Sequence, residues 1–203
     1  MQTMRGLPRN AALVVVLALA IGPAASGQDM PEMSEDAQAS MNAWMELASP
    51  GEHHEHLAQY VGKWKSDLTM WVEPGAEPMT ETAEAEAHFI LGGRFLEWTH
   101  KGTFGGMAYE ARQLDAYNNG SKRYEASWAD NFGTLILHYT GQCDGEGKVR
   151  TMHTEFADPM GGGPISQRAV YTWQDEDHWL YESYMTQGDA EFKNMEIRNS
   201  RVE

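Results

Sequence analysis

The sequence predicts a mostly β protein: one antiparallel, up-and-down, lipocalin-like β barrel of ten strands, preceded by two short helices. Beyond Gly62, apolar and polar residues alternate with period two, the pattern of strands that bury one face. Turn residues interrupt the pattern at regular intervals, and the short gaps leave no room for crossover helices, so successive strands should pair antiparallel. A meander of ten strands has two long open edges unless it closes. We therefore expect a barrel, with a two-sheet sandwich as the alternative.

The first 27 residues have the three parts of a secretory signal peptide. Arg5 and Arg9 form a basic start, an apolar run extends over 11–21, and small residues end the segment. The apolar run is shorter than the roughly 20 residues that cross a bilayer, so we expect no membrane span. We predict cleavage near Gly27/Gln28 and an exported protein, periplasmic or extracellular, that consists of residues 28–203.

Two short helices should precede the barrel. Ser34 is suited to cap a helix with an apolar stripe from Met41 to Leu47, and residues 28–49 are taken as an N-terminal helical segment. Ser49 is expected to cap a second helix, with Pro50 in its first turn and Gly62 at its end. The barrel domain then covers residues 50–203.

Ten strands are expected between Gly62 and the C-terminus, separated by pairs such as Pro74-Gly75 and Asn119-Gly120. Their predicted ranges are 63–73, 79–91, 94–104, 107–117, 123–130, 134–143, 148–157, 165–174, 179–186 and 191–202.

The charge excludes some classes of partner. The chain has 30 acidic and 15 basic residues, and because the first 27 residues hold two of the basic ones and no acid, residues 28–203 carry a net charge of −17. Such a surface repels phosphate backbones and anionic lipid, so we expect no nucleic-acid partner. Cys143 is the single cysteine, which rules out an internal disulfide and favours a buried, unreactive thiol over a nucleophile.

Short motifs recur along residues 50–203 and together carry a family resemblance. They are Pro50-Gly51, His56-Leu57, Val61-Gly62-Lys63-Trp64, Trp71-Val72-Glu73-Pro74-Gly75, Leu91-Gly92-Gly93-Arg94-Phe95, Asp115-Ala116-Tyr117, Trp128-Ala129-Asp130, Gly133-Thr134, Asp158-Pro159-Met160, Glu182, Met185, Glu191-Phe192-Lys193 and Met195-Glu196. With these motifs the chain resembles the bacterial family called domain of unknown function 1579. The resemblance implies a lipocalin-like or fatty-acid-binding-like barrel, but no activity.

Strand alternation points to a polar site inside the barrel. In the third strand, Arg94, Trp98 and His100 share the more apolar face, and in the fifth strand Trp128 and Asp130 share a face. We expect these five residues to face inward. A buried Arg94 needs an acidic partner, either from the protein as a brace at the barrel mouth or from a ligand carboxylate or phosphate.

A second polar pair is predicted less directly. Arg168 and Glu182 lie on later strands, and either could face inward. Two carboxylates such as Asp130 and Glu182 in one dry pocket would shift each other's pKa and could perform acid–base chemistry. This is the basis of an enzymatic alternative, which is less expected than a binding function.

The histidines do not predict a metal site. His53 and His56 are spaced i, i+3 near a helix start, where a solvated surface is the expected reading, and the zinc-protease spacing is absent. We expect no metal and no cofactor. A haem barrel stays open as an alternative, with an axial ligand among the remaining histidines: His88, His100, His138, His153 and His178.

The function that the sequence favours is therefore the binding of a small hydrophobic or amphipathic molecule, which could carry an anionic end, inside the barrel. A further alternative is an envelope interaction protein that binds a partner protein through the stripe from Met41 to Leu47. The candidate ligand-binding residues are Arg94, Trp98, His100, Trp128, Asp130, Arg168 and Glu182.

Overall fold

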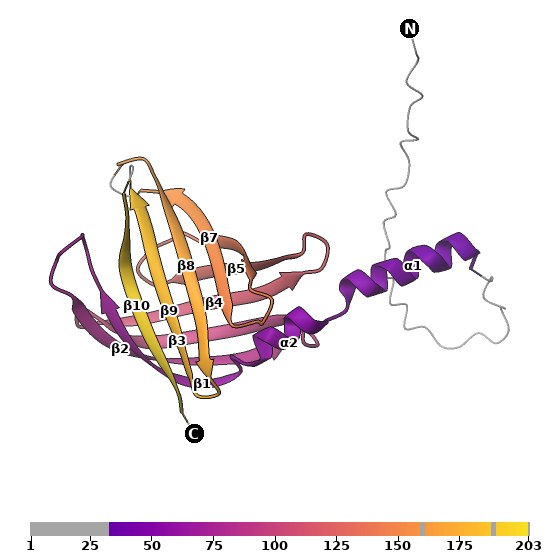
Figure 1. Cartoon of the computed structure of the whole chain (residues 1–203), viewed down its shortest axis with the longest axis horizontal. Coiled ribbons are helices and arrows are strands. Elements are labelled where there is room, and N and C mark those ends of the chain that lie inside the picture. The colour runs from indigo at the N-terminus through magenta and orange to yellow at the C-terminus, as the bar shows by residue number, and fades with distance from the viewer. Residues whose placement is uncertain (1–32, 159–160, 188–189, 203) are drawn as a thin grey trace, which may run out of the picture.

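Ten antiparallel strands close into one barrel (Figure 1), as predicted. This is a computed structural model, and it describes residues 33–158, 161–187 and 190–202. Around the barrel the strands follow the order β1-β10-β9-β8-β7-β6-β5-β4-β3-β2, so every strand pairs with its neighbours in sequence and the first pairs with the last. The alternative of a two-sheet sandwich is therefore wrong.

The elements agree with the predicted ranges to within a few residues. The helices are α1 (Glu35–Ala48) and α2 (Glu52–Ala58). The strands are β1 (Gly62–Met70), β2 (Met79–Ile90), β3 (Phe95–Phe104), β4 (Met107–Asn118), β5 (Arg123–Asp130), β6 (Leu137–Cys143), β7 (Val149–Ala157), β8 (Pro164–Asp175), β9 (His178–Gln187) and β10 (Ala190–Val202).

The barrel closes through a long β1–β10 pairing. The register runs from Lys63↔Val202 to Met70↔Met195. Inside the barrel, the Ser66 hydroxyl donates a hydrogen bond of 2.6 Å to the Asn199 side chain across this junction. Closure therefore rests on both the backbone ladder and a buried side-chain bond.

The pairing of β6 with β7 is much shorter. It runs only from Thr140↔His153 to Cys143↔Arg150, although β7 continues to Ala157 and stays paired with β8 over that stretch. The barrel wall is therefore open between the first residues of β6 and the last residues of β7. We call this opening the β6–β7 seam.

Helix α2 covers one end of the barrel. Leu57 is 1% exposed and His54 is buried, and Tyr60, just beyond the helix, inserts its ring among Trp98, Trp173 and Trp179 at centroid distances of 5.2–6.0 Å. Tyr60 also accepts a 2.9 Å hydrogen bond from the Trp64 indole through its carbonyl oxygen. This end of the interior is filled by an aromatic core, which fixes α2 to the barrel.

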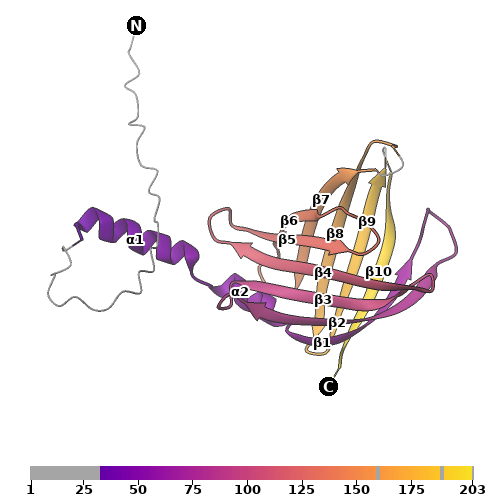
Figure 2. The same ribbon diagram turned by 180° about the vertical axis from the view of Figure 1, so that it is seen from behind.

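Helix α1 projects away from the barrel in both views (Figures 1 and 2), and none of its residues is buried. Ser34 caps it as predicted, since its side chain accepts from the amide of Ala37. Ser49 does not cap α2: its hydroxyl donates to Met45 O at the end of α1, and α2 begins after Gly51. No helix in the described residues is long and apolar enough to cross a membrane.

Candidate functional site

Four of the predicted site residues meet on the inner wall of β3 and β5. The His100 ring stacks on Trp98 (centroids 5.6 Å apart, planes at 13°) and lies 5.0 Å from the ring of Trp128. The Trp128 indole donates a 3.0 Å hydrogen bond to Asp130, which also accepts from the amide of Phe132. The structure thus brings these four side chains together.

His100 holds an unusual position in this wall. Its Nε2 atom is buried and has no hydrogen-bond partner among the residues that the structure describes. Burial, aided by the nearby charge of Arg112, lowers the pKa of His100 to about 4, so the imidazole is neutral at pH 7. A neutral ring nitrogen can donate or accept a hydrogen bond according to its tautomer. The Nε2 atom can therefore pair with either a hydrogen-bond donor or a hydrogen-bond acceptor.

A buried ion pair lies deeper in the barrel, between Asp115 of β4 and Arg150 of β7. Arg150 Nη2 is 3.5 Å from Asp115 Oδ2, and the two side chains are 3% and 1% exposed. Asp115 also accepts hydrogen bonds of 3.0 Å from the Trp98 indole and from the Gln113 amide. The carboxylate is thus well satisfied.

The guanidinium of Arg150 is less well satisfied. It lies over the rings of Tyr171, Tyr60 and Tyr124 at 4.3, 5.3 and 5.7 Å. Within the described part of the chain, none of its three nitrogen atoms has a hydrogen-bond partner of good geometry. Burial is the largest influence on the pKa of Arg150 and lowers it, but Asp115 and the surrounding tyrosines together outweigh burial, so the pKa is raised. Arg150 therefore stays charged and keeps unused donors.

A chain of hydrogen bonds crosses the opposite wall. The Tyr139 hydroxyl donates to Gln167 (2.8 Å), the Gln167 amide donates to Ser183 (2.7 Å), and the Ser183 hydroxyl donates to Asn194 (2.7 Å). These residues belong to β6, β8, β9 and β10, and the chain fixes their side-chain orientations.

The β6–β7 seam forms a depression of about 480 Å³ that reaches this chain. Most of its lining lies on the outer face of the barrel, but Thr154 and Gln167 are inward-facing, buried residues. Gln167 thus joins the floor of the depression to the polar interior. The lining residues are His138, Thr140, His153, Thr154, Glu155, Ser166, Gln167, Arg168, Thr186 and Glu191.

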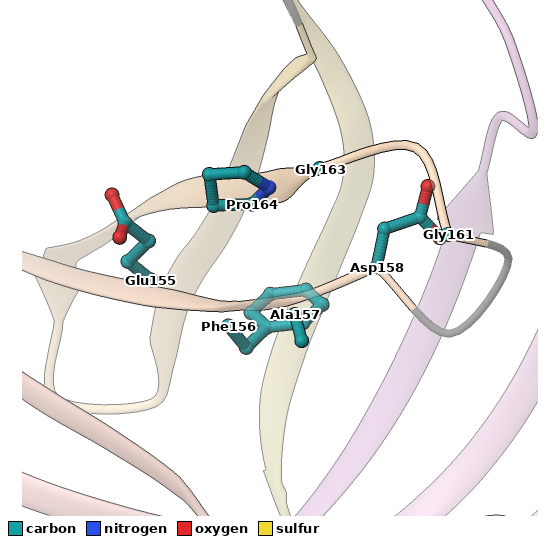
Figure 3. A pocket seen from close by; sticks show the side chains of 7 residues that line it. All are labelled: Glu155, Phe156, Ala157, Asp158, Gly161, Gly163 and Pro164. Carbon is teal, nitrogen blue, oxygen red and sulfur yellow. The ribbon is translucent and has the colours of Figure 1, made fainter.

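Another depression, of about 500 Å³, lies at the end of the β7–β8 hairpin (Figure 3). Its walls are small side chains and backbone together with Glu155, Phe156 and Asp158. The Asp158 carboxylate accepts from the amide of Gly162 within the same turn. This depression brings together no set of groups that suggests a reaction.

The prediction that Arg94 faces inward is wrong. Leu91, Gly92 and Gly93 all have positive φ, so the β2–β3 turn is longer than the alternation implies and β3 begins only at Phe95. Arg94 is exposed on the turn, where its guanidinium donates to the carbonyl oxygens of Ala48 (2.9 Å), Leu91 and Gly92. It braces α1 and does not line the interior.

Arg168 and Glu182 do not form an inner pair either. The inward positions of β8 and β9 belong to residues such as Ala169 and Ser183, so both charged side chains lie on the outer face. Arg168 makes a bidentate ion pair with Glu191 (2.8 and 2.9 Å), and Glu182 accepts from Lys193 (3.1 Å). The acid–base pair of Asp130 and Glu182 is therefore not formed.

The histidines also differ from the expectation. His54 is buried, and the Nδ1 atoms of His53 and His56 lie 3.3 and 3.2 Å from the Tyr124 hydroxyl, so α2 uses them to pack on the barrel. The described residues contain no group of three or more His, Cys, Asp or Glu that could hold a metal ion. Cys143 is half-buried, and burial raises the pKa of its thiol.

The pair Asp115–Arg150 was missed by sequence reasoning, although a signal existed. Arg150 shares one face of β7 with Met152, and Asp115 shares one face of β4 with Tyr117, because residues two apart in a strand point the same way. Each charged residue therefore lies on the apolar face of its strand. Two inward charges of opposite sign on different strands predict a buried pair.

Comparison with known proteins identifies the family but no activity. The family model described as "Protein of unknown function (DUF1579)" matches residues 49–201. No curated protein matches the chain. Among solved structures, the crystal structure of Rv2717c from M. tuberculosis is similar, with a TM-score of 0.56 and 15% identity over 76% of this chain and 100% of that chain. At this identity the likeness concerns the fold alone.

Proposed function

The chain belongs to the DUF1579 family of proteins of unknown function, and from its geometry we propose that it binds a small, mainly apolar molecule against the inner wall formed by Trp98, His100 and Trp128. The observation that carries the proposal is the buried Nε2 of His100, whose ring lies beside two indole rings and which has no hydrogen-bond partner in the part of the chain that the structure describes. A buried polar atom left unpaired costs about 1–3 kcal/mol, so a ligand that pairs with it is favoured by that amount.

The charges favour an uncharged polar end on the ligand. The anionic end considered from the sequence depended on Arg94, which lies outside the barrel. The inner cation, Arg150, is already beside Asp115 at 3.5 Å, and a ligand carboxylate would meet the negative charge of that acid. A carbonyl or hydroxyl oxygen can accept from the free N–H groups of Arg150 without this repulsion.

The β6–β7 seam supports a route for such a ligand. It is the place where the backbone ladder is shortest, and its depression has Thr154 and Gln167 on the floor. A flexible molecule can pass through this opening with little loss of strand pairing. Apolar Leu135 and Ile136, both more than half exposed, precede β6 beside the opening.

Native mass spectrometry and a dye titration test the proposal. We expect purified protein to carry a bound small molecule, or to bind the uncharged dye N-phenyl-1-naphthylamine with a rise in fluorescence. His100→Ala should weaken dye binding by about tenfold, because the wall loses a stacked ring. Lys101→Ala, on the outer face of the same strand, is the matched control. Equal dye binding by both variants, with no bound species, would refute the proposal.

Haem is a second candidate ligand, because His100 alone of the five histidines considered as axial ligands faces the interior. His88, His138, His153 and His178 are exposed. A haemin titration that gives a Soret band in the wild type and none in His100→Ala would identify this case. An unchanged band in the variant would exclude His100 as the axial ligand.

We further propose that the protein is exported. The support is the basic, apolar and small-residue sequence of residues 1–27, which lie outside the described residues. N-terminal sequencing of the protein recovered from a cell envelope or medium fraction should begin near Gln28. Recovery of the intact N-terminus from the cytoplasm would contradict export.

A further inference from the structure

Helix α1 presents an apolar face whose largest side chains are exposed. Trp44 is 64% exposed, and Met45 and Leu47 are each 54% exposed. Met33, just before the helix, is 51% exposed. A patch of large apolar side chains on one helix marks an interaction surface.

The apolar face carries no charge. At 3.6 residues per turn, Ala37, Met41, Trp44 and Ala48 fall on one side of α1. Glu35 and Glu46 fall on the opposite side, and Asp36 lies at the flank. The face therefore differs from the rest of this acidic chain.

The helix is held away from its own barrel. Its last residues are fixed by Arg94, which donates to Ala48 O, and by Asn119, which donates to the carbonyl oxygens of Leu47 and Ser49 at 3.0 and 2.8 Å. Both views show α1 extending outward from this attachment (Figures 1 and 2). Contacts of the chain itself thus hold α1 away from the barrel.

We propose that this face binds the α1 helix of a second copy of the chain, in antiparallel orientation. In that arrangement Trp44 of each copy lies over the small Ala37 of the other, and Ala48 lies opposite Met33. On both sides of a two-fold axis near Met41, each large side chain of one copy therefore faces a small side chain of the other. Such self-complementarity is what an isologous contact requires.

The net charge of the chain opposes self-association everywhere except at the uncharged face of α1. The chain carries a net charge of −15, so copies repel each other where their acidic surfaces approach. The uncharged face of α1 lets two copies meet while Glu35 and Glu46 point to solvent, and the antiparallel arrangement places the barrels at opposite ends. A pair of 14-residue helices buries less than the roughly 1,600 Å² of a standard interface. We therefore expect a weak, concentration-dependent dimer.

Sedimentation equilibrium of the purified protein over a wide concentration range tests the association. We expect a monomer–dimer equilibrium that Trp44→Ala weakens at least about tenfold, since buried Trp side chains dominate interfaces. Asn42→Ala, on the polar face of α1, should leave the dimer unchanged. Circular dichroism in the near ultraviolet verifies that the barrel is folded in each variant.

Cross-linking tests the antiparallel geometry in a Cys143→Ser background. Met41→Cys lies near the proposed two-fold axis and should be joined between copies by a short bis-maleimide. Ala48→Cys should not react across the dimer, because the two copies of residue 48 are then about 20 Å apart along the helices. Cross-linking at residue 48 would indicate parallel helices and contradict the proposed arrangement.

Three other results would overturn the proposal. The protein could stay monomeric at the highest concentrations, or it could form a dimer that Trp44→Ala leaves unchanged. In the third, the protein does not self-associate, and the wild type but not Trp44→Ala floats with phosphatidylcholine vesicles, which would assign the face to a lipid surface. These outcomes do not depend on whether the barrel binds a ligand.

Discussion

Asp115 and Arg150 are the charged residues whose burial matters most. Asp115→Ala leaves the Arg150 guanidinium buried among tyrosines without its counter-ion, so we predict a loss of about 3–5 kcal/mol in the free energy of unfolding. The double variant Asp115→Leu/Arg150→Met should recover much of this loss, because no unpaired charge is left. Urea denaturation of the single and double variants measures both. Equal destabilisation by the single and double variants would show that the pairing of charges is not the cause.

His100 makes stability depend on pH in a defined range. Its pKa is about 4 in the folded protein and near 6.5 in an unfolded chain, so between these values the unfolded state binds more protons. We therefore predict that stability is insensitive to this group above pH 6.5 and falls by up to about 3 kcal/mol as pH decreases towards 4. His100→Gln should flatten this part of the stability–pH curve in urea titrations. An unchanged slope in the variant would assign the dependence to other groups.

At the scale of elements, the close approach of β6 and β7 depends on Gly141. A Cβ on this residue would collide with Thr151 O and lie 2.7 Å from Met152 Cα. We predict that Gly141→Ala destabilises the barrel by about 1–3 kcal/mol, because the four paired residues of this ladder must separate. Thermal unfolding measures the effect. Gly145→Ala, in the turn that joins the same two strands, is the control and should change little, because a Cβ there meets nothing within 4 Å and φ is not positive.

The elements also show what alternation can and cannot predict. Strand ranges and the inward faces of β3 and β5 were predictable because each strand buries one side, as with Trp98 and Trp128. Arg94 was misplaced because three consecutive residues of positive φ make a turn, which shifts the start of β3 by one residue. Glu182 could not be placed because both faces of β9 carry large side chains. Alternation decides orientation only where the two faces differ in polarity.

For the whole molecule, the sequence predicted closure from the need to avoid open edges, and the structure shows that closure is unequal around the barrel. The junction of the first and last strands, β1 and β10, is paired at eight positions and carries the buried Ser66–Asn199 bond. The pairing of β6 with β7, which are neighbours in sequence, has only four positions and leaves the β6–β7 seam open. The weakest part of the wall is thus in the middle of the chain and not at its ends.

Native-state hydrogen exchange tests this order of strength. We predict that amides of β6 and of residues 154–157 in β7 exchange earliest among the strands, through local opening of the seam, while β1 and β10 exchange only with global unfolding. Gly141→Ala should accelerate exchange of the β6 and β7 amides. The amides of β1 and β10 should still exchange only through global unfolding in this variant. Protection that is lost first in β1 and β10 would contradict the prediction. It would mean that the barrel opens between its terminal strands, and that the route proposed for a ligand between β6 and β7 has no dynamic support.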